Sequence, residues 1–168
     1  AGGAVELIRQ ARQRGVLVHA FAVKDGDQGL LFTGVSGAGK STSARIWEKI
    51  DGATLLSDDR VILSKRDGQF WIYGTPWHGD ARIASPEGGP LNRVFIIKHS
   101  PNNYATRLNS IQVASQMLVR SFPTYWYKEG MDFTLSFLEE LSQTVPCYEL
   151  GFVPDTSVVD FIRCMNVP

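Results

Sequence analysis

The feature that most constrains this chain is a glycine-rich stretch between an apolar strand pattern and a helical pattern. Residues 34–42 read Gly-Val-Ser-Gly-Ala-Gly-Lys-Ser-Thr and complete the spacing G-x-x-x-x-G-K-S. Residues 30–33 before it are mainly apolar, and residues 40 to about 50 place Ala44 and Trp47 on one helical face. Such glycines let backbone N–H groups point inward at the positive end of a helix, which is how phosphate is bound. The motif therefore predicts a phosphate-binding loop in an α/β fold.

The side chains of this loop have separate expected tasks. Lys40 would reach the β- and γ-phosphates as a point charge, and the hydroxyl of Ser41 would ligate Mg²⁺. The residues expected to contact the nucleotide are Gly34, Ser36, Gly37, Ala38, Gly39, Lys40, Ser41 and Thr42. Because these contacts fall on phosphates, they imply ATP and Mg²⁺ as cofactors without selecting a base.

Two adjacent carboxylates, Asp58 and Asp59, follow the short apolar strand predicted over residues 53–56. A carboxylate at the end of a strand holds the metal in phosphate-loop proteins, so Asp58 is the expected metal residue. On an extended chain the next side chain points to the opposite side, so Asp59 is free for another task. A carboxylate near the γ-phosphate can accept the proton of an attacking hydroxyl. The alternative interpretation is a turn that begins at the Asp-Asp pair before Arg60.

The rest of the pattern predicts hairpins in the first half and helices in the second. Hairpins are expected over residues 16–33 and 61–73, with a further strand over 93–98. Helices are expected before Gly15, from about residue 107, over about 131–143 and after Asp155, with a strand over 147–150. The expected inward positions of the two middle helices are Leu108, Ile111, Ala114, Leu118, Met131, Leu135 and Leu138. This order is not the strict alternation of a doubly wound sheet.

Length and charge narrow the functional classes. The chain has 168 residues with 17 Lys+Arg against 17 Asp+Glu, which fits a single domain over residues 4–168, with residues 1–3 set aside as an expression remnant. Zero net charge argues against a dedicated nucleic-acid or membrane-surface binder. Without a leader pattern or an apolar run of about 18 residues, the cytoplasm is the expected compartment. Cys147 and Cys164 lie in apolar stretches and are expected in the core.

The sequence resembles the catalytic domain of HPr kinase/phosphorylase and the wider phosphoenolpyruvate-carboxykinase-like group of kinases. The resemblance runs from Leu-Val-His-Ala at residues 17–20, through the glycine-rich motif, to Asp-Asp-Arg-Val at residues 58–61. It implies a mixed, partly antiparallel sheet with a helical C-terminal part. It also implies that His19 lies beside the γ-phosphate, that Asp59 is the base and that Asp58 holds metal, although the two aspartates could exchange roles. Without the resemblance, His19 on an apolar strand would be interpreted as a core histidine.

Two departures from that group bear on the substrate. The Glu-Ile-Arg-Gly-Leu-Gly signature of members that phosphorylate HPr is not found. From the length of the chain, their N-terminal domain is not expected either. Residues 73–82 look like a shorter subgroup that includes kinases of ribosomal peptides. There His78 and Arg82 suit contacts to substrate or γ-phosphate, with Arg82 as an arginine finger and Arg60 and Arg93 as its competitors. An ordinary turn with exposed polar side chains is equally compatible.

The expected activity is transfer of the γ-phosphoryl group of ATP to a hydroxyl, that of a serine in a peptide or small protein. The resemblance also allows a homo-oligomer. One alternative is a small-molecule phosphotransferase or a carboxykinase, but a dicarboxylate substrate needs a converged cluster of cations and the arginines are scattered. The other is a nucleotide-sensing module, which would keep Lys40 and Ser41 but would not need Asp59 or His19.

Overall fold

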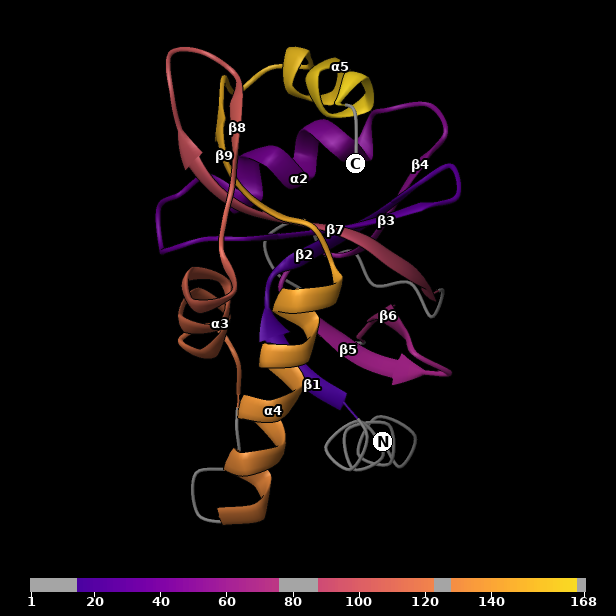
Figure 1. The fold of residues 1–168 in the computed structure, drawn as a ribbon. Coiled ribbons are helices and arrows are strands. Elements are labelled where there is room, and N and C mark those ends of the chain that lie inside the picture. Colours follow the sequence, from indigo (N-terminus) through magenta and orange to yellow (C-terminus); the bar gives the residue numbers. More distant parts are fainter. Residues whose placement is uncertain (1–14, 76–87, 123–127, 166–168) are drawn as a thin grey trace.

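A mixed sheet forms the centre of the protein (Figure 1). The computed structural model describes residues 15–75, 88–122 and 128–165. The strands in this part are β1 (Gly15–His19), β2 (Phe21–Asp25), β3 (Gln28–Thr33), β4 (Ala53–Ser57), β5 (Arg60–Arg66), β6 (Gln69–Gly74), β7 (Gly88–His99), β8 (Tyr104–Arg107) and β9 (Cys147–Phe152). The helices are α2 (Lys40–Glu48), α3 (Ser110–Leu118), α4 (Lys128–Thr144) and α5 (Ser157–Cys164).

The strands pair in both directions. The hairpins β2–β3 and β5–β6 are antiparallel, as their turn residues predict. In contrast, β7 runs parallel to β3 on one side and to β9 on the other, while its first residues pair antiparallel with β6. The mixed α/β class expected from the sequence is therefore confirmed. Strand β8, which pairs with β9, was not predicted.

The apolar run over residues 16–23 is divided into two strands, whereas the sequence predicts one. Strand β1 pairs with β5, and β2 pairs with β3 and β4. The division falls at Ala20, whose N–H donates to the carbonyl oxygen of Asp59 at 3.0 Å. In the strand order β1-β5-β6-β7-β3-β2-β4, the two strands lie near opposite ends although one residue joins them. The sheet must therefore curl, because consecutive Cα atoms are only ~3.8 Å apart.

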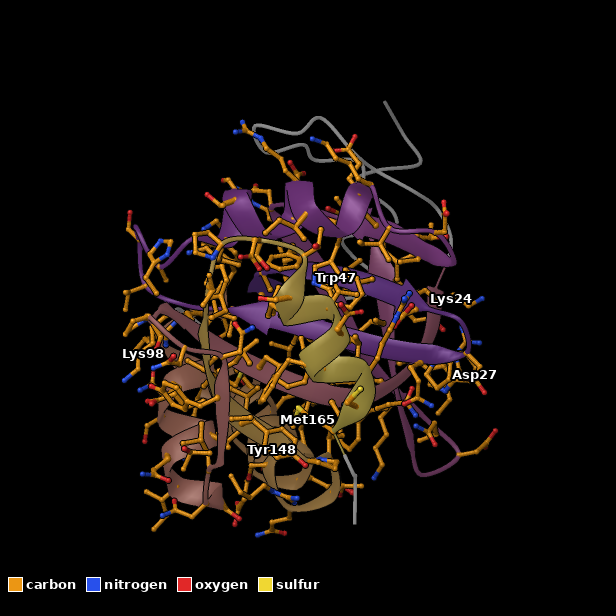
Figure 2. The ribbon with its side chains drawn as sticks, turned by 90° about the horizontal axis from the view of Figure 1, so that it is seen from above. Lys24, Asp27, Trp47, Lys98, Tyr148 and Met165 are labelled. Atoms are coloured by element: carbon orange, nitrogen blue, oxygen red, sulfur yellow. The ribbon has the colours of Figure 1, made fainter. Side chains whose placement is uncertain are left out.

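Alternating side chains of the sheet belong to separate cores on its two faces. On one face Phe32 clusters with Trp47 of α2 and with side chains of α5. On the other face its neighbour Leu31 clusters with Met117 of α3 and Phe137 of α4. Figure 1 shows the same division, with α2 and α5 on one side of the sheet and α3 and α4 on the other. Viewed from above in Figure 2, Trp47 lies between α2 and α5.

The face that helix α3 presents to the core agrees only in part with the predicted one. Leu118, and Leu108 just before the helix, pack against the core as expected. Val113 and Met117 are buried, while Ile111 is 80% exposed. The helix begins at Ser110 because the side chain of Asn109 accepts a bond from the backbone N–H of Gln112, whose own side chain bonds the N–H of Asn109. This capping box fixes the residue at which the helix begins.

Two other expected core positions are also exposed. Leu135 of α4 is 45% exposed, whereas Leu138 and Leu141 are buried. Cys164 is exposed at the end of α5, and only Cys147 is buried. Burial raises the pKa of the Cys147 thiol to about 12. Helices α4 and α5 each carry apolar residues on two adjacent faces, so apolar character alone did not identify the buried face.

Some expectations fall outside this part of the chain. The helix predicted before Gly15 lies outside the described residues, as do His78 and Arg82. None of the helices described is both long enough and apolar enough to cross a membrane.

Candidate functional site

The glycine-rich loop Gly34–Gly39 connects β3 to α2. Gly37 and Gly39 have φ angles of 82° and 98°, in the left-handed region where a Cβ is strained. Gly39 is also the N-cap of α2, with no side chain capping the helix and no acidic residue in its first turn. The first N–H groups of a helix have no partner within the helix, and they carry the positive end of its dipole. The loop therefore offers a positive backbone surface to an anion.

Lys40, the first residue of α2, turns back over this loop. Its Nζ donates to the carbonyl oxygens of Gly34 (2.8 Å) and Val35 (3.0 Å). Burial lowers the pKa of Lys40, and the nearby charge of Arg120 lowers it further, while Asp59 opposes both. A cation whose hydrogen bonds within the described residues go to neutral carbonyls, and which lies near a second cation, is well placed to gain from an incoming phosphate.

A cavity of about 430 Å³ lies over the loop. This volume is typical of small-molecule sites. The loop cavity is lined by His19, Ser36, Gly37, Gly39, Lys40, Ser41, Thr42 and His99.

His99 enters this cavity from the last position of β7. Because β7 is parallel to β3, the two strands end at the same edge of the sheet, and β3 leads into the loop. The His99 ring stacks on Phe152, with centroids 5.2 Å apart. A Cβ on Gly39 would lie 2.8 Å from two atoms of this ring. Loop and imidazole are thus in close contact.

The register of β1 and β5 places an imidazole beside a carboxylate. His19, the last residue of β1, is the cross-strand partner of Arg60, so it lies next to Asp59. Its Nδ1 is 3.0 Å from the carbonyl oxygen of Asp59 and 3.3 Å from Oδ1 of the same residue. Because both neighbours are acceptors, we assign the proton to Nδ1, which leaves Nε2 for a further contact. The other carboxylate oxygen, Oδ2, is 3.4 Å from Nε of Arg60.

The chain after α3 runs along the other edge of β1. The N–H of His19 donates to the carbonyl of Arg120 at 2.7 Å, and the N–H of Phe122 donates to that of Leu17 at 2.9 Å. Val18 and Ser121 form a bridge between these bonds. This backbone seam fixes the segment 120–122 beside the imidazole.

A second cavity, of about 410 Å³, opens on this side of the loop. The Arg120 cavity is lined by His19, Gly34, Val35, Ser36, Val119, Arg120, Ser121 and Phe122. It shares His19 and Ser36 with the loop cavity, so the two cavities meet at the imidazole. Its walls include three exposed apolar side chains, those of Val35, Val119 and Phe122.

The residues predicted from the sequence are brought together only in part. Ser36, Gly37, Gly39, Lys40, Ser41, Thr42 and His19 meet at the loop cavity. Neither Asp58 nor Asp59 is among the residues that line the two cavities. Asp59 reaches them through its contact with His19, whereas Asp58 is half-buried just after β4.

The two arginines proposed as competitors lie in different places. Arg60 is next to Asp59 and its guanidinium lies over the ring of Phe122, 5.1 Å from the centroid. Arg93 is buried on the side of α5, where its Nη1 donates to the carbonyl of Ile162 at 3.1 Å. Arg93 is therefore not part of the two cavities.

His99 and Arg120 were not identified from the sequence. His99 directly follows the strand predicted over residues 93–98, and it is the parallel pairing of β7 with β3 that places it at the loop. Arg120 carries no such signal, because the sequence assigns it to the polar face of a helix and only the backbone seam brings it to β1.

Comparisons with known proteins give a distant similarity of fold. Neither the models of protein families nor the curated proteins include a match to this chain. Among solved structures, the chain is similar to the Hpr(Ser) kinase/phosphatase from Coxiella burnetii, with 14% sequence identity and a TM-score of 0.43. The match covers 88% of this chain and 90% of that one. At this level it defines neither a site nor an activity.

Proposed function

We propose that the protein is an ATP-dependent kinase that transfers the γ-phosphoryl group to the hydroxyl of a serine in a peptide or small protein. The observation that carries the proposal is the position of the His19–Asp59 pair. His19 lies where the loop cavity and the Arg120 cavity meet, and Asp59 is in contact with it. The charge of Asp59 also acts on Lys40, where it opposes the lowering of the lysine pKa by burial and by Arg120. A nucleotide-sensing module needs a phosphate loop but has no use for such a pair.

In the proposed reaction the triphosphate occupies the loop cavity, and the acceptor approaches from the Arg120 cavity. The acceptor oxygen forms a bond to the γ-phosphorus while the bond to the oxygen bridging the β- and γ-phosphates breaks and ADP leaves with that electron pair. Asp59 takes the hydroxyl proton, and His19 orients the carboxylate through Nδ1. Lys40 and the helix N-terminus neutralise charge on the phosphates, so catalysis is mainly positioning and electrostatics.

The residues present fit a magnesium ion that arrives with the nucleotide. Mg²⁺ prefers oxygen ligands and is usually held by one or two side chains together with substrate phosphates. The described residues contain no group of three or more His, Cys, Asp or Glu side chains that would hold a metal by themselves. Ser41 at the loop cavity and Asp58 after β4 would be its protein ligands, and the ion would screen the charge of the phosphates.

The Arg120 cavity favours a serine acceptor over a dicarboxylate metabolite. Two carboxylates would need several converging cations. Among the described residues that line this cavity, Arg120 is the single arginine or lysine, and Val119 and Phe122 are apolar. A hydroxyl with apolar neighbours therefore matches these walls better.

The test is incubation with γ-labelled ATP, Mg²⁺ and a library of serine-containing peptides. We expect labelled peptide with the wild type. A Lys40→Ala variant should weaken ATP affinity by roughly 10- to 100-fold, because it removes charge-assisted bonds to the phosphates. Lys49→Ala, at an exposed site at the end of the same helix, is the matched control and should bind like the wild type. Tight ATP binding without turnover or label, with Mg²⁺ or Mn²⁺, would refute the kinase and favour the sensing module.

Alanine substitutions at Gly37 and Gly39, the two loop glycines with positive φ angles, test the geometry of the loop by comparison with each other. At Gly37 a Cβ would meet no atom within 4 Å, so Gly37→Ala adds only backbone strain. At Gly39 it would lie 2.7 Å from Phe152 and 2.8 Å from His99 as well. We therefore expect Gly39→Ala to lose more ATP affinity than Gly37→Ala, measured by calorimetry on variants checked by thermal unfolding. Equal affinities in the two variants would contradict the close contact between loop and His99.

A further inference from the structure

Arg120 is a buried cation with few partners. The residue is only 9% exposed and follows the C-cap of α3. Its Nη1 donates to the carbonyl oxygen of Gln116 (2.6 Å) and to the side-chain oxygen of the same residue (2.7 Å), which are both neutral acceptors. Its Nε is buried and finds no hydrogen-bond partner among the described residues. A buried charge without a counter-charge is costly unless something else supplies one.

No carboxylate of the described part of the chain forms an ion pair with Arg120. Three other arginines differ from Arg120 in their ion pairing or in their position. Arg60 has Asp59 beside it, and Arg163 is paired with Asp25 at 2.7 Å. Arg93 is buried on the opposite face, near α5. Arg120 therefore combines burial, uncompensated charge and a position on a cavity wall.

The backbone seam holds Arg120 on the acceptor side of the loop. Its carbonyl accepts from the N–H of His19, and the residue lines the cavity together with Gly34, Val35 and Ser36. Its charge acts on Lys40, whose pKa it lowers. Two cations thus face the end of the loop from different elements, Lys40 from α2 and Arg120 from the segment after α3.

We propose that Arg120 binds the γ-phosphoryl oxygens of the nucleotide and neutralises their charge during transfer, as an arginine finger supplied by the chain itself. This inference rests on the proposed function. A guanidinium can donate two parallel bonds to phosphoryl oxygens, a geometry that lysine does not provide. Lys40 and the loop would hold the β-phosphate in both nucleotides. Because Arg120 lies on the acceptor side of the loop, the group that it would contact is the γ-phosphate, which ATP has and ADP lacks.

The test compares the affinities of a non-hydrolysable ATP analogue, AMP-PNP, and of ADP, both with Mg²⁺, by titration calorimetry. No acceptor is needed. Arg120→Met keeps much of the side-chain volume and should weaken AMP-PNP binding by roughly 10- to 100-fold, the value of a lost charge-assisted pair, while ADP binding changes less than about twofold. Arg66→Met, at an exposed arginine of β5, is the matched control and should bind both nucleotides like the wild type.

Each outcome bears on a different proposal. If the wild type binds neither nucleotide, the proposed function fails. If the wild type binds both and Arg120→Met, with a native unfolding transition, loses neither or loses both equally, the role of Arg120 is refuted. Should Arg120→Met fail to fold, Arg120→Lys decides by the same measurement. Lysine keeps the positive charge but cannot donate two parallel hydrogen bonds to a phosphoryl group. The ratio of AMP-PNP affinity to ADP affinity should therefore still fall severalfold. An unchanged ratio overturns the inference.

Discussion

An Asp59→Asn variant is expected to bind ATP at least as tightly as the wild type and to lose phosphoryl transfer by about 10²- to 10⁴-fold. A positioned general base contributes about that much, and an amide cannot take the proton. The amide oxygen can still accept from Nδ1 of His19, so the imidazole keeps its place. Removing a negative charge close to Lys40 also removes repulsion toward the phosphates, so binding should not weaken. Turnover of labelled ATP and calorimetric affinity, measured on one preparation, separate the two effects.

Two further variants sharpen this result. Asp67→Asn lies on the exposed β5–β6 turn, where Asp67 has a positive φ of 49° that asparagine tolerates, and it should keep full turnover. His19→Gln should slow transfer less than Asp59→Asn if the imidazole only orients the carboxylate. If His19→Gln removes transfer and Asp59→Asn retains most of it, the imidazole is the base and our assignment is wrong.

Trp47→Ala is expected to lower the free energy of unfolding by about 3–5 kcal/mol, the range for removing a large aromatic side chain from a core. Trp47 is completely buried, and its ring centroid lies 5.8 Å from that of Phe32. Its indole Nε1 is buried and has no hydrogen-bond partner among the described residues, so the loss comes from packing. Urea unfolding followed by circular dichroism measures the change.

Trp47→Phe provides the comparison. It removes an indole N–H that lacks a partner and keeps an aromatic ring, so it should lose much less stability than Trp47→Ala. Ile111→Ala changes a side chain that is 80% exposed and should stay within about 0.5 kcal/mol of the wild type. Comparable losses for Trp47→Ala and Ile111→Ala would mean that α2 does not depend on this packing.

Local chemistry predicted much of the fold. Apolar runs on either side of Asp-Gly turns identified both hairpins, and the glycine-rich motif identified the transition from β3 to α2. The division of residues 16–23 was missed because both of its strands are buried, and a buried strand shows an unbroken apolar pattern. Helix faces were misassigned where apolar residues cover two adjacent sides, as at Ile111 and Leu135. The pairing of strands and the choice of the buried helix face depend on residues far along the chain.

Prediction of the candidate site from the sequence meets the same limit, because part of the site is assembled by distant pairing. The loop and the nearness of His19 to Asp59 follow from a motif and from a resemblance, and the structure places these residues together. Arg120 and His99 come from elements that only pairing brings near, β1 with the segment 120–122 and β3 with β7. No spacing in the sequence encodes those distances, so an arginine on a polar helix face looked like any solvated residue.

The backbone seam along β1 brings together charged groups that belong to different elements of the fold. The imidazole and the carboxylate are positioned by β1 and the start of β5, whereas the arginine comes with the end of α3. The cation and the apolar wall therefore depend on the segment after α3 and on its hydrogen bonds to β1, whereas the proton-accepting pair depends on the pairing of β1 with β5.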